Sequence, residues 1–196
     1  MAGRSETGGG QRGSVWRISA WIIAALVLFL PLVAMQFTDE VNWDVTDFAF
    51  AGGLIVATGV TFELTARMTN NKAYRAAVGV ALAAAFSLVW INAAVGIIGS
   101  ENNPANLMYG GVLAVGIVGA IIARFKPSGM ARAFFLTALT QGMVGVIALA
   151  AGLGSQAPSF PEAVVFLTGF FVALWLLSAY LFRKAAQERT SAVAAP

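Results

Sequence analysis

The sequence predicts an all-α protein that crosses a membrane six times as a bundle of transmembrane helices. Hydrophobic residues make up 59% of its 196 residues and charged residues 11%, whereas about a quarter of the residues of a globular domain are charged. Long stretches contain no charge at all: 18–38, 76–100, 102–123, 133–161 and 163–182. A helix needs about 20 apolar residues to cross the hydrocarbon layer. The stretches lack the alternation of a barrel strand, so helices are expected.

The first three spans are predicted at 16–37, 48–67 and 75–98, each next to charged residues. Asp44 and Asp47 suit the first turn of the second span. Carboxylates there cap free N–H groups and meet the positive end of the helix dipole.

The last three spans are predicted at 106–125, 132–152 and 162–182. Pro104 suits the start of the fourth, because proline is favoured in the first turn of a helix. One of three small polar residues before that span is expected to cap it: Ser100, Asn102 or Asn103.

Short tails flank this transmembrane domain, which covers 15–184. Residues 1–14 are polar and rich in glycine, so they bury too little apolar area to fold and are expected to form a disordered cytoplasmic tail. Residues 185–196 form a second short cytoplasmic tail, which is expected to fray.

The charges divide sharply between the two sides of the six predicted spans. One side carries all twelve basic residues: Arg4, Arg12, Arg17, Arg67, Lys72, Arg75, Arg124, Lys126, Arg132, Arg183, Lys184 and Arg189. The other carries only acidic ones: Asp39, Glu40, Asp44, Asp47, Glu101 and Glu162. Basic residues of short loops remain in the cytoplasm. Both termini are therefore predicted to be cytoplasmic.

The acidic stretch 39–47 has a second interpretation, as part of a cation site. Asp44, Asp47 and Glu101 are weak candidates for metal ligands, with Asn103 as a further oxygen donor. A hard cation needs several converging oxygens, and the spacing of these residues does not establish that they converge. The interpretation as helix caps and a charged rim is preferred.

The absence of cysteine and histidine removes much chemistry. Disulfides, Cys/His zinc sites, thiol nucleophiles, histidine acid–base pairs and the commonest haem ligands are excluded. No catalytic constellation and no cofactor are predicted. The pI near 9.7 does not indicate a nucleic-acid partner, because the basic residues flank spans instead of forming one exposed face.

Three polar residues inside the spans carry the functional alternatives. Glu63 is followed at i+4 by Arg67, which favours a paired carboxylate that reaches toward the interface. Gln141 and Asn92 need partners, and hydrogen bonds between helices are the plain explanation. Alternatively, Glu63, Asn92 and Gln141 line a polar path through the membrane, because polar groups at such depth often serve transport.

Pairs of small residues on one helix face predict close helix packing at Gly53, Gly79 and Gly116, each followed at i+4 by alanine. A weak internal repeat relates the second and third spans to the fourth and fifth. It also matches Gly99-Ser-Glu to Gly154-Ser-Gln. Shared hairpin geometry explains such a match as readily as duplication does.

Aromatic residues near the span ends predict two interfacial belts. Trp43, Trp90 and Tyr109 are assigned to the outer boundary. Trp16, Tyr74 and Tyr180 are assigned to the inner one.

Three stretches, Phe37-Thr-Asp-Glu-Val-Asn-Trp43, Ala73-Tyr-Arg-Ala-Ala-Val-Gly79 and Gly99-Ser-Glu-Asn-Asn-Pro-Ala-Asn-Leu-Met-Tyr109, resemble a family of small multi-pass bacterial membrane proteins. The resemblance covers roughly residues 18–186 and implies a bacterial inner-membrane location. It implies no activity, cofactor or site residue.

These observations leave three function classes open. The first is a non-catalytic accessory, scaffold or assembly component of a membrane complex, whose partners are the lipid bilayer and other membrane subunits or a second copy. The second is a small transporter or channel that uses the polar path. The third is an intramembrane enzyme that relies on the outer carboxylates, for which no convincing pair is found. The accessory role is preferred.

Overall fold

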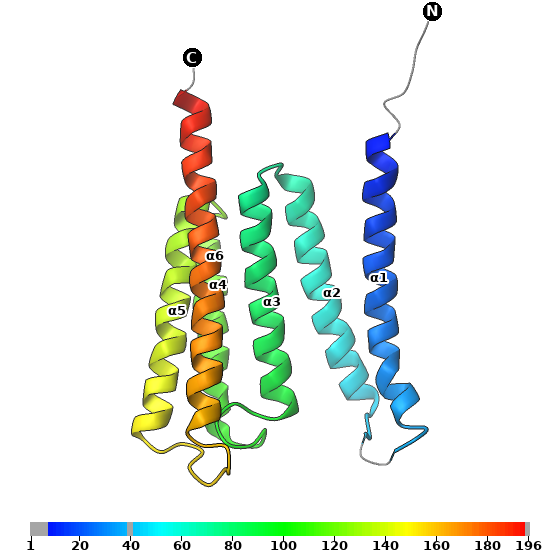
Figure 1. Cartoon of the computed structure of the whole chain (residues 1–196), viewed down its shortest axis with the longest axis vertical. Coiled ribbons are helices and arrows are strands. Elements are labelled where there is room, and N and C mark those ends of the chain that lie inside the picture. Colours follow the sequence, from blue (N-terminus) through cyan, green and yellow to red (C-terminus); the bar gives the residue numbers. More distant parts are fainter. Residues whose placement is uncertain (1–7, 39–40, 195–196) are drawn as a thin grey trace, which may run out of the picture. The chain divides into compact units, whose positions relative to one another are not determined.

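The computed structural model describes residues 8–38 and 41–194, with side chains at 17–38 and 41–191. These residues form six α-helices and contain no strand (Figure 1). The helices are α1 (Gly8–Ala34), α2 (Val45–Met68), α3 (Lys72–Ala94), α4 (Met108–Ile122), α5 (Pro127–Ala150) and α6 (Glu162–Ala194), and a short 3-10 helix, η1 (Pro104–Leu107), precedes α4. Six helical segments are long and apolar enough to cross a membrane. For the described residues, the all-α class and six helices of sufficient length and apolar character to span a membrane are confirmed.

The helix ends differ most from the prediction at the two tails. The predicted disordered tail 1–14 is helical from Gly8 onward, while residues 1–7 lie outside the described part. The C-terminal tail, expected to fray from residue 185, continues α6 to Ala194. Extending an existing helix gains one hydrogen bond per residue without a new nucleus. The residues 185–194 are also mostly good helix formers, such as alanine, glutamine, glutamate and arginine.

The chain divides into two compact units, Met1–Ala57 and Thr58–Pro196. In the first unit, α1 lies against the start of α2. A Cβ atom built on Gly52 would lie 3.5 Å from the Leu28 side chain. The Trp43 and Phe48 rings meet edge to face near the start of α2, with their centroids 5.2 Å apart.

In the second unit, α4 packs on α5 through residues without bulk. A Cβ atom on Gly119 would lie 2.7 Å from the Ala133 Cβ, so only glycine allows the two backbones to come this close. One turn away, a Cβ atom on Gly116 would lie 3.3 Å from the Thr137 hydroxyl oxygen. Among the other predicted packing glycines, Gly79 faces the Phe62 ring at 3.4 Å, and a Cβ on Gly53 would meet no atom within 4 Å.

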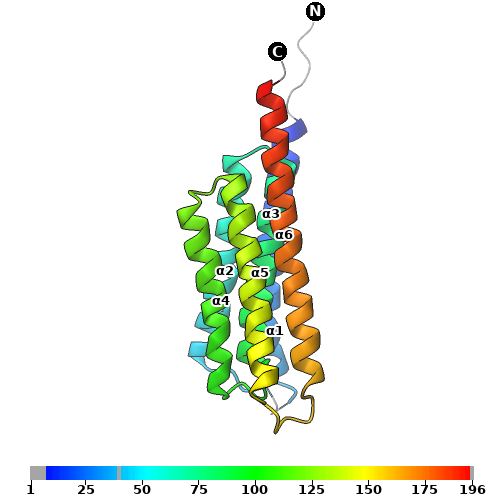
Figure 2. The same cartoon turned by 90° about the vertical axis from the view of Figure 1, so that its left-hand side faces the viewer.

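Helix α6 packs against both α5 and α3 (Figures 1 and 2). Phe134 of α5 stacks on Trp175 and Phe182 of α6, with ring centroids 5.8 and 5.4 Å apart. On the other side, the buried Ser178 hydroxyl donates to the Ala77 carbonyl of α3 at 3.0 Å. Tyr74 of α3 also meets Phe182 edge to face at 5.1 Å. Such aromatic pairs contribute about 1 kcal/mol each beyond the area they bury.

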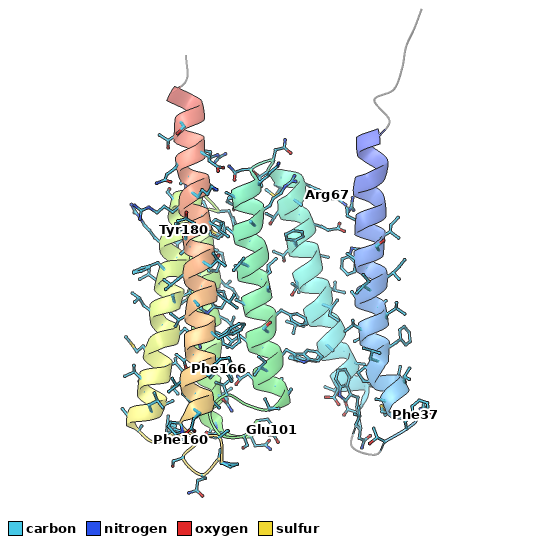
Figure 3. All side chains as sticks on the ribbon, viewed as in Figure 1. Phe37, Arg67, Glu101, Phe160, Phe166 and Tyr180 are labelled. Carbon is cyan, nitrogen blue, oxygen red and sulfur yellow. The ribbon has the colours of Figure 1, made fainter. Side chains whose placement is uncertain are left out.

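All the lysines and arginines of this unit lie toward one end of its helices, the end marked by Arg67 in Figure 3. We call it the basic end. Hydrogen bonds tie its turns together. The Tyr74 hydroxyl donates to the Phe125 carbonyl at 2.9 Å, and the Asn71 amide donates to the Glu188 carboxylate at 2.8 Å. Arg75 donates to the Thr69 carbonyl at 2.7 Å and also to Ala66.

At the opposite end, the connections from α3 to η1 and from α5 to α6 touch through two glycines with positive φ. Gly99 has φ +81° and Gly154 φ +86°, a region that side chains disfavour. A Cβ on Gly154 would lie 2.7 Å from the Gly99 nitrogen. The two residues matched by the weak internal repeat therefore pack backbone against backbone.

The aromatic belts need one correction. Tyr109 lies in the first turn of α4, as expected, but its side chain is buried, 1% exposed, and does not face an interface. Its side chain packs inside the bundle because its face of α4 also carries the buried Val112 and Gly116. At the basic end, Tyr180 is 63% exposed. The Trp16 side chain lies outside the described residues.

Candidate functional site

The acidic residues at the start of α2 act as a helix cap. The Asp44 carboxylate accepts hydrogen bonds from the backbone nitrogens of Thr46, at 2.7 Å, and Asp47, at 3.0 Å. The Asp47 carboxylate in turn accepts from the Asp44 nitrogen at 2.9 Å. This reciprocal arrangement satisfies N–H groups that a helix start leaves free, and it confirms the predicted capping. Asp39 and Glu40 fall outside the described residues.

The remaining carboxylate and amide of the proposed cation site are used locally. The Glu101 carboxylate accepts from the Asn102 amide at 3.0 Å. The Asn103 side-chain oxygen accepts from the Ala105 nitrogen at 3.0 Å and caps η1, with Pro104 in the first turn as predicted. Among the described residues, no three Asp, Glu, His or Cys side chains gather as a group able to hold a metal ion.

Glu63, which was predicted to lie within the second span, pairs with Arg67 on the same helix. A guanidinium nitrogen of Arg67 lies 3.3 Å from a carboxylate oxygen of Glu63. The Glu63 side chain is 21% exposed and that of Arg67 62%, which places the pair at the helix surface near the basic end. The geometry is that of an i,i+4 ion pair whose arginine reaches outward.

Asn92 lines a pocket of about 470 Å³ at the end of the bundle opposite the basic end. Its amide nitrogen donates to the Asn106 carbonyl at 3.1 Å. Its amide oxygen is buried and has no partner within the described part of the chain. Glu101, Asn103 and Tyr109 also line this pocket. Neither Glu63 nor Gln141 does.

Asn106 holds the turn beneath this pocket, a role that the sequence reasoning missed. Its side-chain oxygen accepts from the nitrogens of Ile97 and Ile98 at 3.1 and 2.9 Å, and its amide donates to the Ser100 carbonyl at 2.7 Å. Asn106 is 5% exposed, and both isoleucines are at most 2% exposed. An asparagine after a glycine-rich turn was the available signal. It did not reveal that the two donors came from residues eight and nine positions earlier.

The centre of the α3–α6 bundle holds a set of neutral polar groups with unmet hydrogen-bonding capacity. Gln141 is fully buried, and neither atom of its amide group has a partner among the described residues. The Thr168 and Tyr109 hydroxyls and the Trp175 indole nitrogen are also buried atoms without a partner among these residues. The first two lie near each other without the geometry of a hydrogen bond. Such groups cost about 1–3 kcal/mol each when they stay unpaired.

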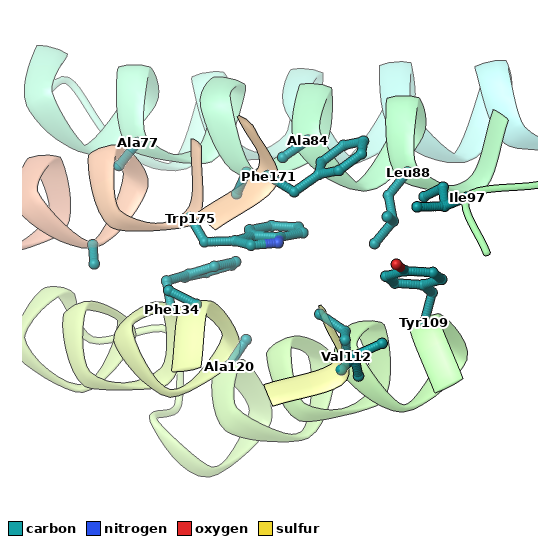
Figure 4. Packing of buried hydrophobic residues seen from close by; sticks show 14 of the residues in the cluster. Ala77, Ala84, Leu88, Ile97, Tyr109, Val112, Ala120, Phe134, Phe171 and Trp175 are labelled. Carbon is teal, nitrogen blue, oxygen red and sulfur yellow. The ribbon is translucent and has the colours of Figure 1, made fainter. Parts of the chain in front are cut away.

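The facing residues of the helices place these groups at neighbouring levels. Gly145 and Gly142 of α5 face Thr168 and Val172 of α6. Gln141 therefore lies between the levels of Thr168 and Trp175, about one turn from each. Figure 4 shows the Tyr109 hydroxyl and the Trp175 nitrogen directed toward the middle of the bundle. We call Tyr109, Gln141, Thr168 and Trp175 the interior polar cluster.

The structure thus places the three predicted path residues in different surroundings. Glu63 is paired at the surface of α2, Asn92 lines the pocket opposite the basic end, and Gln141 belongs to the interior polar cluster. Thr168, Tyr109 and Trp175 were not predicted as partners of Gln141, because an apolar helix gives no sign of which face turns inward. Some other hydroxyls in the spans donate to backbone carbonyls, as Thr137 does to Ala133 at 3.0 Å.

Comparison of the chain with family models, curated proteins and solved structures gave no match. The resemblance to small bacterial multi-pass membrane proteins therefore stays a prediction.

Proposed function

We propose that this protein is a non-catalytic accessory, scaffold or assembly component of a complex in the bacterial inner membrane, with both termini in the cytoplasm. The orientation is supported by the location of the basic residues of Thr58–Pro196 at one end of its helices, because positive residues of short loops stay on the cytoplasmic side. The short connections between the six helices leave little chain outside the membrane.

The accessory role rests on an unused face of α4. Gly110 and Gly111 are exposed, and a Cβ atom built on either would meet no atom within 4 Å. Ala114, one turn further, is exposed as well. A glycine inside a helix costs about 1 kcal/mol relative to alanine, and in membranes small residues permit close helix approach. On α4 the buried face, with Gly116, already serves α5, so the second small face supports contact with another membrane protein.

Site-specific crosslinking tests this proposal. Because the sequence has no cysteine, an introduced cysteine provides the only thiol of this chain. In membranes of cells that express the protein natively, Ala114→Cys labelled with a benzophenone maleimide is expected to yield one discrete adduct after illumination. Mass spectrometry should identify the same second membrane protein, or a second copy of this chain, in repeated preparations.

Met143→Cys is the matched control, because Met143 is 62% exposed on another helix and has no glycine or alanine three or four positions away. It should give no discrete adduct. Equal adducts from both positions, or a crosslink at Ala114→Cys that stays within one chain, would contradict a role in assembly.

The interior polar cluster favours a second candidate, a small transporter or channel. Its members have hydrogen-bonding capacity that no described residue uses, and such groups in a membrane commonly face a solute or water. All four are uncharged, so the cluster suits water or a small neutral polar solute better than an ion.

Flux through liposomes separates the two candidates. For a transporter, purified protein should accelerate the passage of water, glycerol or urea in stopped-flow experiments, and Gln141→Leu should return the rate to that of empty liposomes. Thr140→Val is the control, because the Thr140 hydroxyl already donates to the Leu136 carbonyl at 3.0 Å. Rates equal to those of empty liposomes for every solute would dismiss transport of these solutes and leave the accessory role ahead.

A further inference from the structure

A groove of about 1050 Å³ runs between α5 and α6 at the basic end. We call it the α5–α6 groove. Its lining changes from polar and basic residues at the tip of the helices to apolar residues further along them. Ser128 and Gln187 line its tip, and Arg132 and Arg183 line it toward the bundle. Arg132 directly precedes the charge-free stretch 133–161, and Arg183 directly follows the charge-free stretch 163–182. The two arginines therefore mark the boundary between interface and hydrocarbon.

The arginines of the groove are available to a ligand. Within the described part of the chain, neither guanidinium has a hydrogen bond or an ion pair. Arg67, in contrast, is paired with Glu63. Two guanidinium groups that line one groove form a site for an anion with several oxygens, because each presents a fork of N–H donors.

The start of α5 adds to this attraction. Helix α5 begins at Pro127, and no side chain caps it. The backbone N–H groups of its first turn have no partner inside the helix, and the positive end of the helix dipole lies there. Ser128, in this turn, lines the groove. A phosphate group suits this combination.

Beyond the arginines the lining is apolar. Phe135 and Tyr180 come first, followed by Leu136 and Leu176. These side chains are 41–63% exposed, although they are large and lie within the spans. The groove therefore continues from a cationic mouth into an apolar trough along the helix direction, which is the direction of lipid chains.

We propose that the α5–α6 groove binds an anionic phospholipid from the leaflet at the basic end. The phosphate lies between Arg132 and Arg183 near Ser128, and one acyl chain follows Phe135, Leu136 and Leu176. An anionic phospholipid fits both parts of the groove. A free anion would leave the apolar trough without a ligand, and a neutral lipid would leave the charge of the two arginines uncompensated. Basic pockets between transmembrane helices recognise anionic lipids in this way. The inference stands independently of the accessory role.

Native mass spectrometry of the purified full chain in a neutral detergent tests the proposal. Phosphatidylglycerol is titrated in, with phosphatidylcholine as the neutral comparison. The wild-type chain should bind phosphatidylglycerol at least tenfold more tightly than phosphatidylcholine. Arg132→Gln/Arg183→Gln should weaken phosphatidylglycerol binding about 25-fold, at about fivefold per arginine, and leave phosphatidylcholine binding unchanged.

The double variant Lys72→Gln/Lys184→Gln removes the same charge at the same end. Lys72 and Lys184 are exposed and do not line the groove, so this control should stay within twofold of wild type. Both double variants should elute like wild type from a sizing column. Equal losses in the two double variants would overturn the proposal, because attraction to the whole basic end would then explain the binding.

Two further arms identify the source of the anion. Ala131→Trp keeps both arginines but fills the groove that Ala131 lines, and it should also reduce phosphatidylglycerol binding at least tenfold. Inorganic phosphate at millimolar concentration should not displace the lipid. Displacement by phosphate, together with unchanged lipid binding by Ala131→Trp, would assign the arginines to a free anion and overturn the lipid site.

Discussion

Replacing Asn106 by alanine is expected to lower the free energy of unfolding by about 4 kcal/mol. The substitution leaves the N–H groups of Ile97 and Ile98 without the acceptor that now lies 3.1 and 2.9 Å away. Both residues are buried, so water cannot replace that acceptor without opening the turn. An unpaired buried donor costs about 1–3 kcal/mol, and two are created here. Unfolding by SDS in mixed micelles, followed by tryptophan fluorescence, measures the loss.

Asn102→Ala supplies the comparison. Asn102 is exposed, and its side-chain amide donates to the neighbouring Glu101 carboxylate. A surface substitution of this kind changes stability by about 0.5 kcal/mol or less. If the free energies of unfolding of Asn106→Ala and Asn102→Ala differed by less than about 1 kcal/mol, the turn would not depend on the two hydrogen bonds. The pocket at Asn92, whose amide donates to the Asn106 backbone, would then lack the support assigned to it.

Local features of this fold were predictable because they depend on spacing along the chain. The spans follow from the charge-free stretches, and the Asp44–Asp47 cap from carboxylates three residues apart at a helix start. The Glu63–Arg67 pair follows from the i,i+4 spacing. In each of these cases the partner lies within one helical turn, so the geometry of a single helix determines the contact.

Contacts between helices could not be predicted in the same way. In a soluble helix, polar residues mark the outward face. Here apolar residues surround each helix, because lipid replaces water outside. Tyr109 was therefore assigned to an interfacial belt although its side chain is buried, and the partners of Gln141 were missed. The position of Arg132 and Arg183 along the same groove likewise depends on the register between α5 and α6. No pattern within either helix predicts this register.

Gly154→Ala is expected to lower the free energy of unfolding by about 3 kcal/mol. Gly154 has φ +86°, and an alanine in this region costs about 1–2 kcal/mol. Its Cβ would in addition lie 2.7 Å from the Gly99 nitrogen and 3.1 Å from the Ile98 carbonyl carbon. Both are backbone atoms that cannot rotate away, so the two connections must separate. The same SDS titration reports the loss.

Gly152→Ala separates the two contributions, because Gly152 has φ +63° but a Cβ there would meet only the Ser155 hydroxyl oxygen, at 3.9 Å. This variant should therefore lose about 1–2 kcal/mol, the cost of the backbone conformation alone. The difference between the variants measures the contact between the connections that carry Gly99 and Gly154. Equal losses would mean that the connections move apart freely. Glycine at both repeat-matched positions would then reflect the turn conformation of each hairpin and not their packing against each other.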